Sequence, residues 1–382
     1  KKKKKKKGEK KKKKIATITF HSAHNYGSNL QAYALQEYIK KISGEAYSYE
    51  IINLRTDIQK QQYSLTKDNK FISRFVRKFV LKDFERKNKE KFERFEKFIN
   101  NNLQITKEFK SLEELNNANL KYDYLISGSD QLWNLRANDF DWAYFLEFAN
   151  SGKKISYAAS FGPKKMVWTE EEKNRVRKDL EQYKYISVRE EGSQNNIREL
   201  LGKEVPIYMD PTILLTKDEW NKIVPKERIY KGKYILYYSL GQKKEDIELV
   251  NKISKILKMP VVTTRYAGRR ELFKGFKQFY EVGPIEFLNL LENAELVLSS
   301  SFHGTIFSVI FGVPFFAING LKDYRISTLL KKVKLENRSI DLINYKEKCS
   351  NYGDISFKEA HKELENEKDK STKYLKEALD II

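Results

Sequence analysis

A histidine stands between a predicted strand and a predicted helix in the second half of the chain. The run S-S-S-F-H-G-T spans residues 299–305, after the apolar segment 294–298 and before the apolar segment 306–311. The N-terminus of a helix presents free N–H groups and a positive dipole, which favour an anion. We therefore predict a phosphate or carboxylate site made of His303, Ser301, Gly304 and Thr305. The alternative is that Ser300 or Ser301 only caps the helix and that the histidine packs in the core.

A second polar loop lies near the start of the chain. H-N-Y-G-S-N occupies residues 24–29, between a β-rich run at 15–20 and a segment of helical periodicity at 30–42. It matches neither G-x-x-x-x-G-K-[ST] nor G-x-G-x-x-G, so it is not one of these nucleotide-binding loops. Small and polar residues would let a ligand approach the helix there. The candidate binding residues are Asn25, Tyr26, Gly27 and Ser28. Alternatively, Asn25 or Ser28 only caps the helix.

Three more predicted strands end in residues that could do chemistry. In I-S-G-S-D-Q-L-W-N (126–134), Asp130 could accept a proton from a sugar hydroxyl, and Gln131 or Trp133 could orient the sugar ring. Arg189, directly after an apolar strand, suits bidentate capture of a carboxylate or phosphate. The remaining candidates at these strand ends are Gly128 and Ser160.

Each of these residues also has a structural interpretation. Asp130 could be a helix cap, and Arg189 could form a salt bridge to Glu190 or Glu191. A further strand end, D-P-T at 210–212, is interpreted as a turn at a domain edge.

The order of the predicted elements indicates an α/β fold with parallel sheets. Strands alternate with helices, and the carboxyl ends of parallel strands gather along one edge, where ligands bind. The predicted strands are 15–20, 49–54, 122–127, 154–159, 185–188, 205–209, 234–241, 261–264, 295–298 and 313–318. The predicted units are a disordered lysine-rich tail (1–14), an N-terminal α/β domain (15–216) with a helical insertion (60–118), a C-terminal α/β domain (230–345) and a C-terminal helix (355–382) that could pack back on the first domain.

The insertion is basic and rich in phenylalanine at near-helical spacing. Its helices could pack on the rest of the protein, or form a basic amphipathic face for a membrane surface. We prefer packing and keep peripheral membrane contact as an alternative.

Charge and composition limit the classes of function. The net charge is +22, and half of it comes from the first 14 residues, which cannot form a core and do not enter the functional argument. The remaining positive charge favours anionic ligands. No nucleic-acid-binding motif, run of about 18 apolar residues or secretory signal pattern is present. The single cysteine, Cys349, excludes an intrachain disulfide and a cysteine-based zinc site. We expect a cytoplasmic protein without a metal or an organic cofactor.

Taken together, these segments resemble the polysaccharide pyruvyl transferase family. The matching pieces are T-F-H-S-A-H-N-Y-G-S-N-L-Q-A-Y-A-L-Q (19–36), Y-L-I-S-G-S-D-Q-L-W-N (124–134), S-Y-A-A-S-F-G (156–162), I-S-V-R-E (186–190), D-P-T (210–212) and S-F-H-G-T-I-F-S-V-I-F-G-V-P-F (301–315). They occur in order over about 300 residues.

The resemblance implies a fold similar to GT-B glycosyltransferases, with two Rossmann-like domains and the site in a cleft between them. It also implies transfer of a pyruvyl group from phosphoenolpyruvate to a sugar of a surface polysaccharide or its lipid-linked precursor, as a cyclic ketal, with release of phosphate. Arg189 matches a family arginine that would hold the donor, and His303 matches the family histidine near phosphoenolpyruvate. Such an enzyme would work in the cytoplasm, at the inner face of the membrane where the acceptor is lipid-linked.

One departure from the family pattern concerns the donor. Many members carry Arg-x-His where this chain has Ser301-Phe302-His303, so a positive charge is absent. The arginines that could supply this charge are Arg265, Arg269, Arg270 and Arg325. Two alternatives therefore stay open: a glycosyltransferase that uses a nucleotide sugar, and a non-catalytic glycan-binding subunit.

Overall fold

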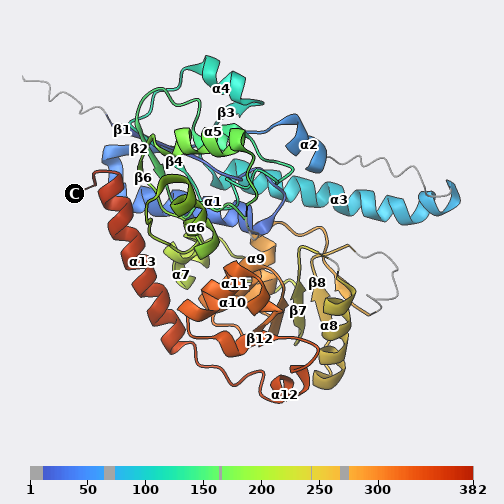
Figure 1. Ribbon diagram of the computed structural model, residues 1–382. Helices are drawn as coiled ribbons and strands as arrows, with labels where there is room; N and C mark the ends of the chain where they lie inside the picture. The colour runs from blue at the N-terminus through green and yellow to red at the C-terminus, as the bar shows by residue number, and fades with distance from the viewer. Residues whose placement is uncertain (1–11, 64–73, 163–165, 242, 267–274, 382) are drawn as a thin grey trace, which may run out of the picture.

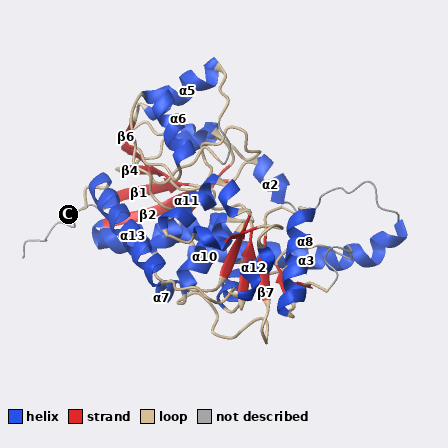
Figure 2. Ribbon diagram, turned by 60° about the horizontal axis from the view of Figure 1, so that its bottom comes forward, coloured by secondary structure: helices blue, strands red, loops and turns tan. Residues whose placement is uncertain are grey.

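The chain folds into two lobes, each built on a six-stranded parallel sheet (Figures 1 and 2). The computed structural model describes residues 12–63, 74–162, 166–241, 243–266 and 275–381. The first sheet consists of β1 (Lys13–Ile18), β2 (Tyr47–Leu54), β3 (Ile105–Phe109), β4 (Tyr124–Ser127), β5 (Lys153–Ser156) and β6 (Tyr183–Tyr185). The second consists of β7 (Ile235–Tyr238), β8 (Val261–Thr263), β9 (Lys277–Gln278), β10 (Leu296–Ser299), β11 (Phe315–Ile318) and β12 (Ser339–Ile340).

Both sheets have the same doubly wound order. The first runs β3-β2-β1-β4-β5-β6 and the second β12-β11-β10-β7-β8-β9, so the first strand of each lobe lies beside its fourth. In such a sheet the chain turns in opposite directions from these two strands, which opens a crevice at their carboxyl ends. The α/β prediction with two parallel sheets is therefore confirmed.

Helices cover both sheets. They are α1 (Tyr26–Ser43), α2 (Asp57–Tyr63), α3 (Arg74–Asn102), α4 (Leu112–Ala118), α5 (Glu170–Leu180), α6 (Glu191–Leu201), α7 (Lys217–Trp220), α8 (Lys244–Leu257), α9 (Pro284–Glu292), α10 (Phe302–Phe311), α11 (Tyr324–Lys332), α12 (Tyr345–Ser350) and α13 (Lys358–Ala378). A 3₁₀ turn, η3 (Pro211–Leu214), lies where the chain passes from one lobe to the other. The inner strands β4, β7 and β10 are short and buried throughout, as expected for a parallel sheet covered on both faces.

One hydrophobic core joins the two lobes. Tyr26 of α1 and Phe95 of α3 belong to the same buried cluster as Trp220, Phe287 and Phe307 from later in the chain. The ring of Tyr26 stacks on that of Phe287 with centroids 4.5 Å apart. Aromatic pairs of this kind contribute about 0.5–1.5 kcal/mol beyond the area they bury, so they help to fix one lobe against the other.

The last helix runs along both lobes (Figure 1). Near its start, Ala360 and Leu364 of α13 pack in the core that contains the second sheet's residues. Near its end, Tyr374 and Leu375 pack against the first sheet. Asp380, which follows the helix, pairs with Lys153 of β5 at 2.8 Å.

Several details differ from the sequence prediction. The segment 60–118 is not purely helical, because β3 lies within it and extends the first sheet beyond β2. The segment 205–209 forms only a single bridge, from Ile207 to Val188, instead of a strand. The predicted tail reaches too far, because β1 already begins at Lys13; residues 1–11 lie outside the described part of the chain. The short edge strands β9 and β12 were not predicted, because two residues carry no periodicity.

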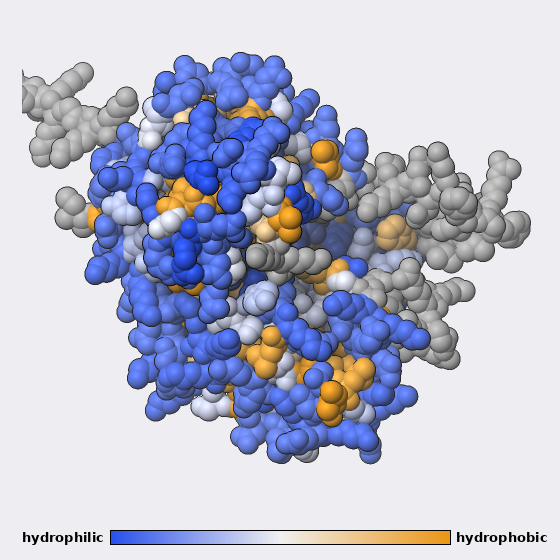
Figure 3. All heavy atoms as spheres, in the orientation of Figure 1, coloured by the Kyte–Doolittle hydropathy of each residue, from blue (hydrophilic) through white to orange (hydrophobic). Residues whose placement is uncertain are grey.

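Four phenylalanines of the insertion pack on the rest of the protein. Phe95 and Phe98 are buried, Phe84 stacks near Tyr280, and Phe92 packs edge-on against His24. Phe71 lies outside the described residues. In the described ranges, no helix is both long and apolar enough to cross a membrane. The face seen in Figure 3 is mainly hydrophilic, with hydrophobic residues in small groups.

Candidate active site

Strand ends from both lobes converge on one polar cluster. The loop after β1 leads into α1, the loop after β4 carries Asp130, and the loop after β10 leads into α10. In the second lobe, Ser300 after β10 donates a hydrogen bond to Ser239 after β7, with 2.7 Å between the hydroxyl oxygens. The loops singled out in the sequence therefore lie at the crevices where doubly wound sheets bind ligands.

His303 lies at the start of α10 and reaches across to the first lobe. The helix begins at Phe302, so the histidine is its second residue and not part of a loop. Ser301 occupies the N-cap position, but its side chain makes no capping hydrogen bond, so the simple capping interpretation is wrong for it. Nε2 of His303 lies 3.4 Å from Oδ2 of Asp210, within ion-pair distance, and among the described residues this buried nitrogen has no hydrogen-bond partner. The carboxylate of the first lobe thus faces the ring nitrogen of the second.

Gly27 makes room for this imidazole. A Cβ atom at Gly27 would lie 2.0 Å from Nδ1 of His303, so no larger residue fits without moving the ring. Gly27 stands at the N-terminus of α1, where Oδ1 of Asn25 accepts a hydrogen bond from its N–H at 2.9 Å. The capping interpretation is thus correct for Asn25. The N-termini of α1 and α10 meet at the histidine.

Asp130 is held by two donors on the other side of the cluster. Its Oδ2 accepts a hydrogen bond from the hydroxyl of Ser28 at 2.8 Å, and its Oδ1 accepts one from the N–H of Gln131 at 2.8 Å. Its φ angle is +93°, in a region that non-glycine residues rarely adopt. Backbone strain of this kind costs about 1–3 kcal/mol and is concentrated at functional sites. Asp130 is therefore a positioned carboxylate and not a helix cap.

Arg189 lies among three carboxylates. Its guanidinium is 3.0 Å from Asp210, 3.7 Å from Asp130 and 3.6 Å from Glu190, and only 4% of the residue is exposed. It also lies over the ring of Phe302, 5.3 Å from the centroid. The alternative that it pairs with Glu190 is confirmed, whereas the predicted capture of a donor anion now has to compete with three carboxylates.

The pKa values in the cluster follow from burial and these charges. Burial would raise the pKa of Asp210, but the charges of His303 and Arg189 and the hydrogen bonds it accepts lower it far below its ordinary value. Burial raises the pKa of Glu190, and Arg189 only partly opposes this. Burial disfavours the charged form of Arg189, but Asp130, Asp210 and Glu190 raise its pKa. Asp210 is therefore the most firmly ionised carboxylate of the cluster.

Asp210 is the residue whose role the sequence prediction missed. It was assigned to a turn at a domain edge, yet it contacts both Arg189 and His303, and the hydroxyl of Ser129 donates to it at 3.4 Å. It also caps η3 by accepting from the N–H of Thr212 at 3.0 Å. The sequence did contain an indication: Asp210 directly follows the apolar segment 205–209, and Asp130 was chosen because it too follows a predicted strand.

The other predicted residues mostly support the cluster. Ser160 donates to Glu190 at 2.8 Å. Thr305 donates to the carbonyl of Ser301, within its own helix. Gly304 allows α10 to pack on β10, since a Cβ there would lie 2.2 Å from the hydroxyl of Ser299, and Gly128 is similarly confined by Thr17 and Thr19.

Two aromatic residues among the candidates are structural. Trp133 is fully buried and stacks on Phe145, so it cannot orient a sugar. The hydroxyl of Tyr26 donates to the carbonyl of Val282 at 3.1 Å, which ties the first lobe to the second.

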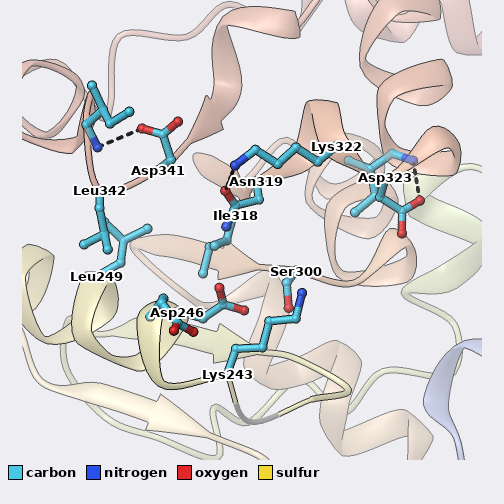
Figure 4. A pocket seen from close by; sticks show the side chains of 13 residues that line it. Lys243, Asp246, Leu249, Ser300, Ile318, Asn319, Lys322, Asp323, Asp341 and Leu342 are labelled. Atoms are coloured by element: carbon cyan, nitrogen blue, oxygen red, sulfur yellow. Dashed lines mark hydrogen bonds between the residues drawn. The ribbon is translucent and has the colours of Figure 1, made fainter.

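A pocket of about 680 Å³ opens at the carboxyl ends of the second sheet's strands, with Ser300 in its wall (Figure 4). Asp246 and Asp341 supply carboxylates, and Lys243 and Lys322 supply cations. Burial raises the pKa of Asp246. A pocket with apolar walls and a few carboxylates suits a polyhydroxylated ligand. Ser300 lies three residues before His303, so the pocket adjoins the polar cluster.

Of the arginines considered as substitutes for a charge at position 301, Arg325 pairs with Asp323 at 2.8 Å. Arg265 lies on the loop after β8, and Arg269 and Arg270 lie outside the described residues. In the part of the chain that the structure describes, no group of three or more His, Cys, Asp or Glu side chains is arranged to hold a metal ion.

Comparison with solved structures shows the fold. A proposed UDP-N-acetylglucosamine 2-epimerase from Listeria monocytogenes aligns with a TM-score of 0.56 at 12% identity, covering 93% of this chain and 91% of its own. The UDP-GlcNAc 2-epimerase of Neisseria meningitidis, bound to UDP-GlcNAc, gives 0.53 at 12% identity, with 96% and 99% covered. S. aureus MnaA with UDP gives 0.54 at 12% identity, with 97% and 98% covered. The two lobes thus have the GT-B-like arrangement expected.

Comparison by sequence shows the family. No curated protein matches the chain. The family model described as "Polysaccharide pyruvyl transferase" matches residues 25–320, a span that runs from the cap of α1 past β11 and contains Asp130, Arg189, Asp210 and His303. The chain therefore belongs to the polysaccharide pyruvyl transferase family.

Proposed function

We propose that this protein transfers the pyruvyl group of phosphoenolpyruvate to two hydroxyls of one sugar, forming a cyclic ketal and releasing phosphate. The family supports a transferase of this kind. The observation that carries the proposal is the pairing of His303 from the second lobe with Asp210 from the first, beside the positioned carboxylate of Asp130.

The reaction needs one proton donor and one proton acceptor. A proton is added to the methylene carbon of the donor, which becomes a methyl group, and the adjacent carbon becomes electrophilic. One sugar hydroxyl attacks this carbon and loses its proton. The bond to phosphate then breaks, with the electron pair leaving on the phosphate oxygen, and the second hydroxyl closes the ring. Of the two hydroxyl protons, one restores the acid and the other leaves with phosphate.

The residues of the cluster match these tasks. His303 supplies the proton, and the carboxylate of Asp210 faces its Nε2 at 3.4 Å. Asp130 accepts the hydroxyl proton, and the hydrogen bonds from Ser28 and the N–H of Gln131 hold its carboxylate in place. Arg189 acts as a positioning residue that balances the carboxylates. The proposal requires no metal or organic cofactor.

The acceptor sugar is proposed to bind in the pocket of Figure 4, where carboxylates can accept hydrogen bonds from its hydroxyls. We propose that the sugar belongs to a surface polysaccharide or its lipid-linked precursor, and that the protein works in the cytoplasm, at the inner face of the membrane where the acceptor is lipid-linked.

The test combines a labelled donor with a panel of acceptors. Purified protein is incubated with ¹³C-labelled phosphoenolpyruvate and oligosaccharides, and phosphate release and labelled glycan are both measured. We expect phosphate release only with an acceptor, and a loss on the order of 10²–10⁴ in rate for His303→Ala and Asp130→Asn, the usual contribution of acid–base catalysis. His361→Ala, which changes the histidine bonded to the carbonyl of Val309, is the matched control.

Three outcomes would contradict the proposal. Turnover of a nucleotide sugar in place of phosphoenolpyruvate would show a glycosyltransferase. Binding of glycan without turnover of any donor would show a carbohydrate-binding subunit. Full activity in a folded His303→Ala protein would remove the assigned proton donor.

A further inference from the structure

A lysine of α3 lies on an aromatic platform at the contact between the two lobes. Nζ of Lys91 is 4.6 Å from the ring centroid of Tyr280, 5.3 Å from that of Tyr26 and 5.8 Å from that of Phe95. Among the described residues, no carboxylate lies within ion-pair distance of it. Its neighbours on α3, by contrast, are paired: Lys87 with Glu281 and Lys89 with Glu93.

A second cation stands beside it. Arg265, in the loop after β8, precedes Tyr266, whose ring packs edge-on against that of Tyr280 at 5.5 Å, and Tyr280 is the ring nearest to Lys91. Burial lowers the pKa of Lys91 to about 8, and the positive charge of Arg265 contributes to this. Burial raises the pKa of Tyr280 and of Tyr238, and the positive charge of Arg265 partly offsets this rise. In the described ranges, no carboxylate forms an ion pair with Arg265 either.

These cations adjoin the candidate active site from two directions. Tyr26, under Lys91, precedes Gly27, which touches the imidazole of His303. The ring of Tyr238 lies 5.8 Å from that of Tyr26 and borders Gly304, the residue after His303. Position 301 is where the family pattern calls for an arginine that this chain lacks.

The polar cluster itself does not favour an anion. Around Arg189 stand three carboxylates, Asp130, Glu190 and Asp210, so one arginine faces up to three negative charges. Two like charges in a partly buried place, as at Lys91 and Arg265, cost stability unless an anion compensates them. Within the described residues, Lys91 and Arg265 are thus two cations without a carboxylate partner, next to a site that contains three carboxylates.

We propose that Lys91 and Arg265 form an anion-binding subsite that takes a phosphate group of a substrate. The inference rests on the proposed function where that substrate is the donor. Two sources share the chemistry: the phosphate of phosphoenolpyruvate, and a phosphate or diphosphate that links the acceptor sugar to its carrier. Cation–π contacts hold the ammonium group while leaving it free to meet a ligand oxygen.

Binding measurements without turnover test the subsite. Isothermal titration calorimetry is carried out with inorganic phosphate, phosphoenolpyruvate and pyrophosphate, on the full chain and on Lys91→Met, Arg265→Met and the control Lys89→Met. We expect Lys91→Met and Arg265→Met to weaken binding at least tenfold and Lys89→Met to leave it unchanged. Equal affinity of Lys91→Met and the unchanged chain for all three ligands, or no binding of any of them, would overturn the subsite.

The same titration separates the two sources. Preference for phosphoenolpyruvate assigns the subsite to the donor, and preference for pyrophosphate assigns it to the acceptor. Binding of phosphate and pyrophosphate but not of phosphoenolpyruvate would leave the subsite standing while removing the proposed donor.

A pH series supplies a readout that a purely structural lysine would not give. The ammonium form binds the anion, so affinity should be nearly constant below about pH 7 and fall as the pH rises through 8, where Lys91 loses its proton. Lys91→Arg cannot lose its charge in this range and should keep its affinity to pH 9.5. The same decline in both proteins would contradict the assignment to Lys91.

The stability of the ligand-free protein completes the test. If Lys91 serves only to bridge aromatic rings, Lys91→Met should lower the melting temperature. If it is held ready for an anion, removing its uncompensated charge should leave the melting temperature unchanged or raise it. A clear drop, with anion affinity retained, would establish the structural role instead.

Discussion

At the scale of single residues, the site depends on how charges are shared. Asp210 contacts both the guanidinium of Arg189 and the imidazole of His303, and it is fully buried. Removing one partner from a buried set of charges is costly because the others remain without compensation. Asp210 is therefore the carboxylate that connects the side chains of Arg189 and His303 in the cluster.

Asp210→Asn should therefore destabilise the protein by about 3 kcal/mol or more, within the range for breaking a buried ion pair. The pKa of Asp210 is lowered on folding, so its contribution is present above about pH 4 and is lost as the pH falls through the folded pKa. Chemical denaturation should show a constant gap between the two proteins from pH 5 to 8, narrowing below about pH 4. A gap that widens towards low pH would contradict this view.

Gly27 gives a second prediction at this scale. Gly27→Ala places a methyl group against Nδ1 of His303, so the ring must move and turnover should fall at least tenfold. The matched control is Gly192→Ala in α6, where a Cβ would meet nothing within 4 Å and where activity should be unchanged. The measurement is kcat of both variants. If Gly27→Ala and Gly192→Ala have similar kcat values, the imidazole of His303 has room to move away from the added methyl group.

At the scale of secondary structure, the candidate site lies at strand ends, and the sequence predicted which loops come together there. The loops after β1, β4 and β10 were chosen because small and polar residues follow apolar runs, and all three meet at the cluster. Neighbouring parallel strands end on the same edge, so the pattern along the chain becomes proximity in space.

What the sequence could not give was the pairing across the lobes. His303 and Asp210 lie 93 residues apart, and nothing local indicates that they touch. For the same reason only the adjacent Glu190 and Glu191 were considered as partners of Arg189, since its other carboxylate neighbours, Asp130 and Asp210, come from other loops. The strand β3 was missed because its alternating residues, I-T-K-E-F, are too polar to stand out among helices.

The last helix allows a test at this scale. Leu375 of α13 is fully buried against the first sheet, so Leu375→Ala should cost about 2–5 kcal/mol. Lys373→Ala, on the exposed side of the same helix, should change the unfolding free energy by no more than about 0.5 kcal/mol. Guanidinium denaturation of both variants provides the measurement, and equal stability would show that the helix end contributes little.

At the scale of the whole molecule, charge should guide the substrate. The net charge is +22, and half of it lies beyond the first 14 residues. A positive field raises the encounter rate with an anionic donor and is screened by salt. We expect kcat/KM for phosphoenolpyruvate to fall several-fold between 0.05 and 0.5 M KCl, with kcat nearly constant. A variant without residues 1–11 should keep this dependence; a salt-independent kcat/KM would argue against steering.

The helix α13 has a consequence for how the lobes can move. It is anchored at one end beside the second sheet and at the other beside the first, and it lies along one side of the molecule (Figure 1). Because α13 is attached to both lobes, the lobes cannot separate on the side where this helix lies. They can open only by rotating about that side. Since His303 and Asp210 come from different halves, even a slight rotation would part the proton donor from its carboxylate. The helix would then form the axis about which the two lobes turn, with His303 on one lobe and Asp210 on the other.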